Sequence, residues 1–397
     1  MLAIPFIIIY LIVNFFVGAD LYLWIKSFKN PFRFKKAKVI FGTIYGILTS
    51  LIIIAFLLPD SELKKIFSRI TNYYLGFMIN LLIVLAAAHL GALIMKLFRL
   101  IPKDFFVKGR PKFIAGWVCL VFAAVFSVYG FVNANNIKVS TYNVSINKSG
   151  EDMKIVLVAD THLGYSLGAR NMQDMAEKIN ALEPDLVCFA GDIFDNNYNS
   201  LDDPQKIKDA FLSINATYGK YACWGNHDVV DRLIGGFSIS FDKDQKIDDR
   251  MKIFLEESGI TVLEDEAVVI DNKFTLIGRL DMSNPGTDNN KRLKIDEFEF
   301  DETLPVICMD HEPDELQKKA DAGIDLDLGG HTHNGQFFPL NLGIGFMWEN
   351  PKGHITKKGK NDHIMHNIVT EGVGVYGPFM RTFTNSEIVE INVTFEN

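Results

Sequence analysis

Hydrophobic residues follow two different patterns along this 397-residue chain. Near the N-terminus they form four long runs with few polar interruptions, at Leu2–Ile25, Val39–Leu58, Tyr73–Met95 and Phe113–Ala134. A helix rises about 1.5 Å per residue, so each run is long enough to cross about 30 Å of hydrocarbon. The pattern therefore predicts an α-helical transmembrane region of four spans over residues 1–134, with a lipid bilayer as its surroundings.

Beyond residue 134 the hydrophobic runs are short. A polar stretch at 135–149 predicts a linker, and a globular domain is expected over 150–397. In this domain, β-rich runs such as "KIVLVAD" and "LVCFAGD" end abruptly in polar clusters, while Ala169–Leu182 repeats apolar residues at helical spacing. Strands that are apolar on both faces and alternate with helices predict an α/β domain, here with mixed sheets.

Charge separates the same two regions. Residues 1–134 contain 15 Lys and Arg against 4 Asp and Glu, whereas the remainder has a net charge of −19. An acidic domain lacks the basic face that nucleic acids require, so no nucleic-acid partner is expected. An acidic surplus is compatible with the binding of divalent cations.

The basic residues of the N-terminal region gather in two of the three loops between the spans. The first and third loops carry Lys26, Lys29, Arg33, Lys35, Lys36, Lys38, Lys96, Arg99, Lys103, Lys108, Arg110 and Lys112. Loops rich in Lys and Arg remain in the cytoplasm. The charge pattern therefore predicts a multi-pass cell-membrane protein whose globular domain lies outside the cytoplasm.

Polar residues and cysteines within the apolar runs have mainly structural explanations. Asn80 and His89, in the third span, are expected to form hydrogen bonds between helices; the alternatives are a pathway through the membrane or a lipid-headgroup site. The four cysteines also lie in apolar runs, and they are expected to be buried thiols without disulfide bonds.

Candidate chemistry is concentrated in five polar clusters, each placed after a predicted strand. They are "DTH" (160–162), "GDIFD" (191–195), "GNHD" (225–228), "DHEP" (310–313) and "GHTH" (330–333), and they hold five of the nine histidines. In α/β folds, ligands bind beyond the carboxyl ends of the strands. The clusters are therefore expected to meet in one site.

The side chains in these clusters are of the types that bind divalent metals. Asp, Asn and neutral His suit Mn²⁺, Fe and Zn²⁺. The candidate ligands, too many for one tetrahedral ion but enough for two, are Asp160, His162, Asp192, Asn226, His311, His331 and His333. Two ions clamp a phosphoryl oxygen and lower the pKa of a bridging water, so that hydroxide is present at neutral pH. Asp192 is suited to bridge the ions, and His227, oriented by Asp228, to assist the leaving oxygen.

In order and spacing, the clusters resemble the motifs of the calcineurin-like metallophosphoesterases, over about residues 150–397. The resemblance implies a double β-sandwich flanked by helices, with His227 as the catalytic histidine supported by Asp228. It implies one metal on Asp160, His162, Asp192 and His333, and a second on Asp192, Asn226, His311 and His331. "GHTHNGQ" and "EGVGVYGPFMR" are most similar to segments of the bacterial membrane-anchored YkuE/YaeI-like branch, which has Gly where this chain has Asn334.

The residues from His331 to Asn334 allow two predictions about local structure. In a strand, His331 and His333 would project to the same side, with Thr332 pointing away. Asn334 tolerates a positive φ better than most residues, so the turn is expected to survive the loss of the glycine.

The predicted activity is metal-dependent hydrolysis of phosphoric ester or pyrophosphate bonds. A domain tethered to the membrane suggests a phospholipid or lipid-linked phosphate as substrate. Arg381 is a candidate contact for the substrate phosphate, and Asp195 a candidate support for Asp192. The alternative function is a non-catalytic, metal-binding domain of a membrane sensor or transporter.

Overall fold

The computed structural model describes residues 3–27, 31–107, 109–239, 245–287 and 291–396. Leu2, Lys29, Lys108 and Asn397, which the predicted spans, loops and domain include, lie outside the described residues. Contacts divide the chain into two compact units. The helical unit comprises Met1–Val132, Leu233–Ile239 and Gly377–Met380, and the sheet unit comprises Asn133–Arg232, Ser240–Tyr376 and Arg381–Asn397.

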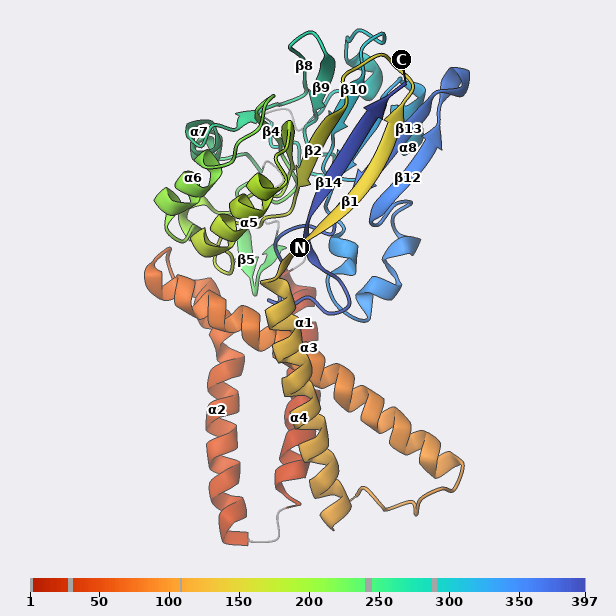
Figure 1. The fold of residues 1–397 in the computed structure, drawn as a ribbon. Coiled ribbons are helices and arrows are strands. Elements are labelled where there is room, and N and C mark those ends of the chain that lie inside the picture. Colours follow the sequence, from red (N-terminus) through yellow and green to blue (C-terminus); the bar gives the residue numbers. More distant parts are fainter. Residues whose placement is uncertain (1–2, 28–30, 108, 240–244, 288–290, 397) are drawn as a thin grey trace. The chain divides into compact units, whose positions relative to one another are not determined.

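Four long helices form most of the helical unit (Figure 1). They are α1 (Ala3–Ile25), α2 (Pro31–Leu57), α3 (Glu62–Leu97) and α4 (Gly109–Ala134). All four are long and apolar enough to cross a membrane, as the sequence predicts. The third helix begins earlier than expected because the side chain of Ser61 accepts a hydrogen bond from the Lys64 amide and caps its first turn.

Polar side chains inside the helical unit pair between helices, as expected. Asn80 on α3 donates a 3.0 Å hydrogen bond to Ser127 on α4. His89 on α3 lies 2.7 Å from the carboxylate of Asp20 on α1. Each pair satisfies groups that would be costly to leave unpaired in an apolar medium.

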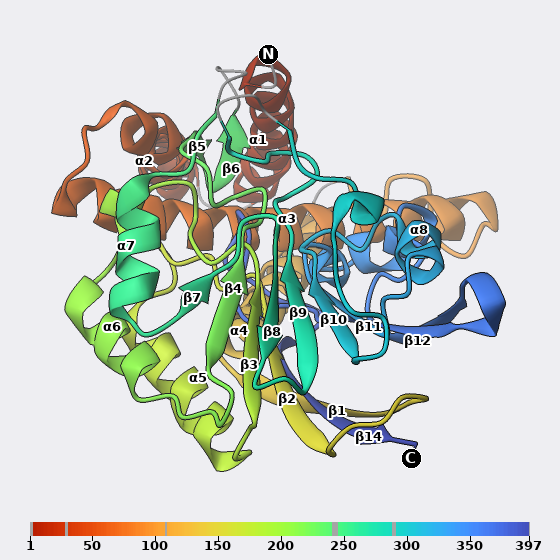
Figure 2. The same cartoon turned by 90° about the horizontal axis from the view of Figure 1, so that it is seen from above.

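Two six-stranded mixed sheets form the frame of the sheet unit (Figures 1 and 2). The first sheet has the order β1 (Ile137–Ile146), β14 (Ser386–Phe395), β2 (Met153–Val158), β3 (Leu186–Ala190), β4 (Lys220–Cys223) and β7 (Thr261–Val262). The second has the order β12 (Gly353–Lys358), β13 (Ile364–Val369), β11 (Leu326–Gly329), β10 (Val306–Met309), β9 (Phe274–Gly278) and β8 (Glu266–Ile270). Strands β2, β3, β4 and β7 run parallel to one another in the first sheet, and β9, β10, β11 and β13 run parallel to one another in the second.

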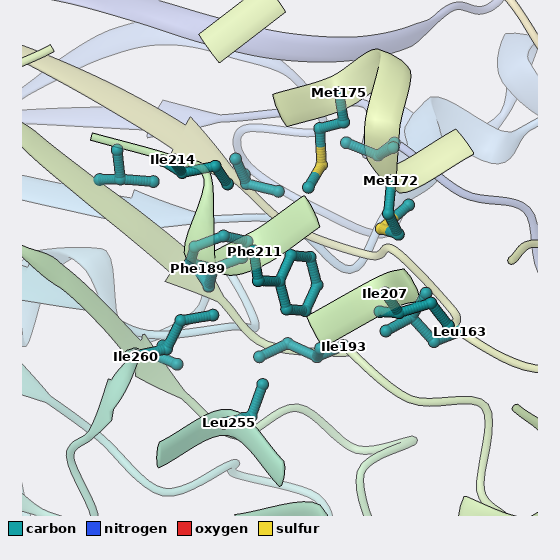
Figure 3. Packing of buried hydrophobic residues seen from close by; sticks show 14 of the residues in the cluster. Leu163, Met172, Met175, Phe189, Ile193, Ile207, Phe211, Ile214, Leu255 and Ile260 are labelled. Carbon is teal, nitrogen blue, oxygen red and sulfur yellow. The ribbon is translucent and has the colours of Figure 1, made fainter. Parts of the chain in front are cut away.

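Apolar residues on both faces of the sheets explain the layering. On β2, Ile155 and Leu157 join the core between the two sheets, while Val156 and Val158 join the core beneath the helices of the first sheet. Those helices are α5 (Ala169–Ala181), α6 (Pro204–Leu212) and α7 (Asp249–Glu257), and α8 (Leu316–Asp321) covers the second sheet. Met172 and Met175 of α5 are fully buried in this packing (Figure 3). The observed architecture is the double β-sandwich flanked by helices that the resemblance implies.

One segment differs from its prediction. Most of the expected linker at 135–149 forms strand β1, which pairs in parallel with β14 over its whole length. Its alternation of β-branched and polar residues favours an edge strand more strongly than a loop. All four cysteines are buried and free, as expected.

A small hairpin follows the "GNHD" cluster. It consists of β5 (Arg232–Ile234) and β6 (Phe237–Ile239). The sequence places this hairpin in the predicted globular domain. Its residue Ile234 nevertheless packs in an apolar cluster with Tyr10, Ile52 and Leu75 of the helical unit. Its few residues carry too weak a pattern to reveal this placement from sequence.

Candidate metal centre

The five polar clusters converge because they follow strands that are neighbours in the two sheets. Three clusters come after β2, β3 and β4, and two come after β10 and β11. Since adjacent parallel strands end at the same edge of a sheet, residues far apart in sequence meet there. The structure brings all seven candidate ligands into this one region.

One group of side chains contains Asp160, His162 and His333, each buried. The Nε2 atoms of the two histidines lie 3.0 Å apart. Oδ1 of Asp160 lies 3.4 Å from Nε2 of His333. Side chains from three separate loops thus point at one small volume.

A second group contains Asp192, His311 and His331. Oδ2 of Asp192 lies 3.1 Å from Nε2 of His311 and 3.7 Å from Nε2 of His162, which belongs to the first group. Asn226 joins the second group, with its Oδ1 2.9 Å from Nδ1 of His331. Asp192 faces side chains of both groups. A third group, His162, Asp195 and His227, shares His162 with the first.

The buried atoms of these groups fit a divalent cation. Nε2 of His311 is fully buried and has no hydrogen-bond partner among the described residues. Nδ1 of the same ring lies 2.8 Å from the carbonyl oxygen of Ala190 and donates to it, so Nε2, which faces the carboxylates of Asp192 and Asp160, is the nitrogen placed to bind a cation. A buried imidazole nitrogen that faces two carboxylates suits a metal ligand once it has lost its proton.

The charge states of the site suit the same role. Burial alone would raise the pKa of Asp192, but the charge of His311 holds it well below its ordinary value, and the Asp192 carboxylate in turn raises the pKa of His311 against the effect of burial. Burial lowers the pKa of His331 to about 3, and it lowers the pKa of His333 strongly as well. At neutral pH the carboxylate is ionised and these two imidazoles are neutral, which are the forms that bind metals.

The backbone at the site is unusual. Positive φ angles occur at Asp160 (53°), Asp192 (51°), His331 (70°), His333 (47°) and Asn334 (49°). Non-glycine residues adopt this region rarely and at some cost, and such residues gather at functional sites. The expectation that the last histidine pair lies in a strand is wrong, because β11 ends at Gly329 and tight turns follow. The expectation for Asn334 is confirmed.

Glycines allow the backbone to approach the candidate ligands closely. A Cβ atom on Gly330 would lie 2.4 Å from Oδ2 of Asp160 and 2.6 Å from Cβ of Ala159. A side chain at this position would therefore displace the carboxylate.

We predict that Gly330→Ala lowers metal affinity by about 10- to 100-fold, the usual cost of disturbing the support of a ligand. Metal titration of the purified full-length protein measures this loss. Gly345→Ala is the matched control, since a Cβ there meets nothing within 4 Å. Equal affinities in the two variants would contradict the placement of Asp160.

The environment of His227 differs from the expectation. Nδ1 of His227 lies 2.6 Å from Oδ1 of Asn196, whose Nδ2 donates to the carbonyl oxygen of Val229. Asn196 therefore accepts from the imidazole and sets its orientation. The carboxylate of Asp228 instead accepts from the backbone amides of Phe194 and Gly225, at 2.8 and 2.7 Å. Asp228 thus fixes the loops and does not bond the ring.

Asn196 follows the "GDIFD" cluster directly, but nothing in its sequence position pointed to His227. We predict that Asn196→Ala lowers kcat about 10- to 100-fold with little change in KM, because the ring loses its orientation. In a His227→Ala background, the same substitution should have almost no further effect. Steady-state kinetics of the four proteins decides this, and additive losses would contradict the assignment.

Arg381 is completely buried. Its Nη2 donates to the carbonyl oxygens of Glu371, Gly372 and Gly374 at 2.6, 3.0 and 2.7 Å, and lies 3.0 Å from Nδ1 of His333. Burial lowers the pKa of this guanidinium to about 10, so it remains charged at neutral pH. The predicted contact with a substrate phosphate does not fit this burial, and Arg381 instead orients His333.

Two further residues lie beside the site. The sequence suggested that Asp195 supports Asp192. In the structure, Oδ1 of Asp195 instead lies 3.7 Å from Nδ1 of His162. The ring of Tyr376 lies 4.8 Å from that of His227 and 6.1 Å from that of His162. No sequence pattern singled out Tyr376, since aromatic residues are abundant throughout the chain.

This fold and this set of side chains define the class of metal-dependent phosphoesterases, and comparison with known proteins agrees. The family model of the calcineurin-like phosphoesterases matches residues 153–335. The chain belongs to this superfamily, and its general activity is that of a phosphoesterase hydrolase.

Several relatives share most of the same region. A metallophosphoesterase of Aquifex aeolicus is 28% identical over 278 residues, which cover 68% of this chain and 97% of the relative. A zebrafish (Danio rerio) transmembrane protein with a metallophosphoesterase domain is 30% identical, covering 69% of this chain and 61% of that protein. The metallophosphoesterase YkuE of Bacillus subtilis is 27% identical, covering 62% and 81% respectively.

Proposed function

We propose that this protein is an integral-membrane phosphoesterase with a site for two divalent cations, Mn²⁺, Zn²⁺ or Fe²⁺. Its substrate is a phospholipid or a lipid-linked phosphate or pyrophosphate. The observation that carries the proposal is the pair of adjacent ligand groups, each with three buried or half-buried side chains, which share Asp192 as a neighbour.

The residues of the proposed site have different roles. Asp160, His162, Asp192 and His333 would hold one cation, and Asp192, Asn226, His311 and His331 the other. When bound, the cations neutralise charge on the phosphoryl oxygens and make a water molecule more acidic. Arg381 keeps the ring of His333 in place.

His227 is positioned to serve the leaving group. Asn196 occupies its Nδ1, so Nε2 is the nitrogen left for the substrate. Burial lowers the pKa of the ring, and an approaching anionic phosphate opposes that effect and favours the protonated form. A protonated Nε2 can then donate its proton to the departing oxygen.

A lipid substrate is supported by the short connection to the helices. Only Asn135 and Asn136 separate the end of α4 from the start of β1 along the chain. A phosphoesterase tethered this closely meets lipid headgroups at a high effective concentration.

The catalytic domain is proposed to face away from the cytoplasm. The basic residues of the first and third loops between the helices support this orientation. A reporter enzyme fused to the C-terminus and assayed with an impermeant substrate on intact cells tests it. Activity only after cell lysis would place the domain in the cytoplasm.

The activity is tested on the purified full-length protein, first freed of metal and then supplied with Mn²⁺, Zn²⁺ or Fe²⁺. Aryl phosphate monoesters and diesters serve as general substrates, followed by phospholipids, lipid pyrophosphates and nucleotides. We expect metal-dependent release of phosphate and preference for a lipid. Stoichiometric metal without hydrolysis of any phosphoester would instead support the sensor or transporter function.

A further inference from the structure

A cleft in the helical unit carries polar groups that the metal centre does not use. It is lined by residues of α1, α3 and α4 and of the loop before α4, encloses about 350 Å³, and has a mainly apolar wall. Three ionisable side chains, Asp20, His89 and Lys112, are part of its lining. Ionisable groups among membrane-spanning helices are costly, so their presence in a cavity indicates a functional site.

The three ionisable groups offer both signs of charge. Oδ2 of Asp20 and Nε2 of His89 lie 2.7 Å apart, and the histidine side chain remains 58% exposed. Among the residues that the structure describes, Lys112 has no ion-pair partner. The cleft is therefore lined by an ammonium group without an ion-pair partner and by an adjacent imidazole and carboxylate.

The three ionisable groups lie toward one end of their helices. Asp20 and His89 lie near the C-terminal ends of α1 and α3, and Lys112 lies in the first turn of α4. Leu81 and Leu85 extend the apolar wall along α3 toward its middle. A polar end joined to an apolar wall fits an amphiphile that lies along the helices.

We propose that this cleft binds one membrane phospholipid with an amine headgroup, such as phosphatidylethanolamine. An acyl chain lies along the apolar wall. Lys112 and His89 hold the phosphodiester, and the carboxylate of Asp20 accepts a hydrogen bond from the amine. This lipid is proposed as a ligand of the helical unit, separate from the substrate of the metal centre.

Filling the cleft tests the site without disturbing the helices. Gly91 lines the cleft, and a Cβ on this residue meets nothing within 4 Å, so Gly91→Phe should occupy the space of the acyl chain. Gly46→Phe is the matched control, because Gly46 on α2 is equally unobstructed and lies outside the cleft lining.

The probe is phosphatidylethanolamine with a photoreactive acyl chain, added to the full-length protein in nanodiscs of phosphatidylcholine. Mass spectrometry maps the labelled residues. We expect labelling at the cleft, with Met95 and Cys119 as reporters on α3 and α4, loss of that labelling in Gly91→Phe, and retention in Gly46→Phe. Labelling spread evenly over all four helices, or unchanged by Gly91→Phe, would overturn the site.

Headgroup selection is tested by competition and by substitution. Unlabelled phosphatidylethanolamine should compete better than phosphatidylglycerol, and diacylglycerol should compete least. Lys112→Ala should weaken labelling about fivefold, the value of one basic group near a headgroup, whereas Lys103→Ala, outside the cleft lining, should not. If diacylglycerol competed as well as phosphatidylethanolamine, the cleft would bind lipids without recognising the headgroup, and the proposal would be refuted.

Discussion

Asp192→Asn is expected to lower phosphoester hydrolysis by at least about 100-fold, more than the loss of a residue that only supports a ligand. The carboxylate faces both ligand groups, with Oδ2 at 3.1 Å from His311 and 3.7 Å from His162. An amide carries no charge and cannot be shared between two cations. Oδ1 of the new side chain can still accept from the His227 amide, as Asp192 does at 2.7 Å, so the fold should survive.

The measurement is kcat with Mn²⁺ together with the metal content of the same preparation. Asp209→Asn, an exposed carboxylate on α6, is the control and should leave both unchanged. Wild-type turnover in Asp192→Asn would show that the assignment of two cations is wrong. Lost turnover with full metal content would place Asp192 in catalysis and not in metal binding.

The second large effect concerns stability. Lys319→Met is expected to lower the free energy of unfolding of the sheet unit by about 3–5 kcal/mol, the usual cost of removing one partner from a buried ion pair. Lys319 is fully buried on α8, and its Nζ lies 2.7 Å from Asp327 and 3.3 Å from Asp310. Asp327 is in β11 and Asp310 directly follows β10. The lysine therefore connects two strands whose carboxyl ends precede the candidate metal ligands.

Lys318→Met provides an internal control on the same helix. The Lys318 side chain is 71% exposed and pairs with Glu315, so its loss should change the free energy of unfolding far less than the loss of Lys319. Denaturant unfolding of the metal-free proteins measures both.

Burial raises the pKa of Asp327 and the Lys319 charge opposes that rise. Without the lysine, the deficit should therefore shrink as the pH falls and Asp327 takes up a proton. Equal costs for the two substitutions would contradict this role of Lys319.

Local patterns in the sequence predicted many features of the fold and of the candidate site. The helices of the first 134 residues follow from long apolar runs, and helix α5 follows from apolar residues at helical spacing. The five clusters follow strands whose ends share an edge, so their convergence was predictable. These features depend on which residues are apolar and on their periodicity, and both are visible in a single chain.

Other features of the site depend on contacts between distant segments. Asn196 contacts His227, Arg381 contacts His333, and neither pair has a spacing that a local pattern would reveal. The sequence suggested Asp228 and a substrate phosphate as the partners of His227 and Arg381. The structure corrected both because hydrogen-bond partners are chosen by packing, which satisfies buried polar groups with whichever atoms the fold brings near.

The sequence by itself determined the apolar helices, the alternation of strands and helices, and the identity of the seven candidate ligands. Only the tertiary structure decided which side chains contact His227 and His333, and that residues 233–239 and 377–380 belong to the helical unit. It also decided that a cleft in that unit gathers Asp20, His89 and Lys112 from α1, α3 and α4. Periodicity reports which face of an element is buried, whereas the three-dimensional packing decides what that face meets.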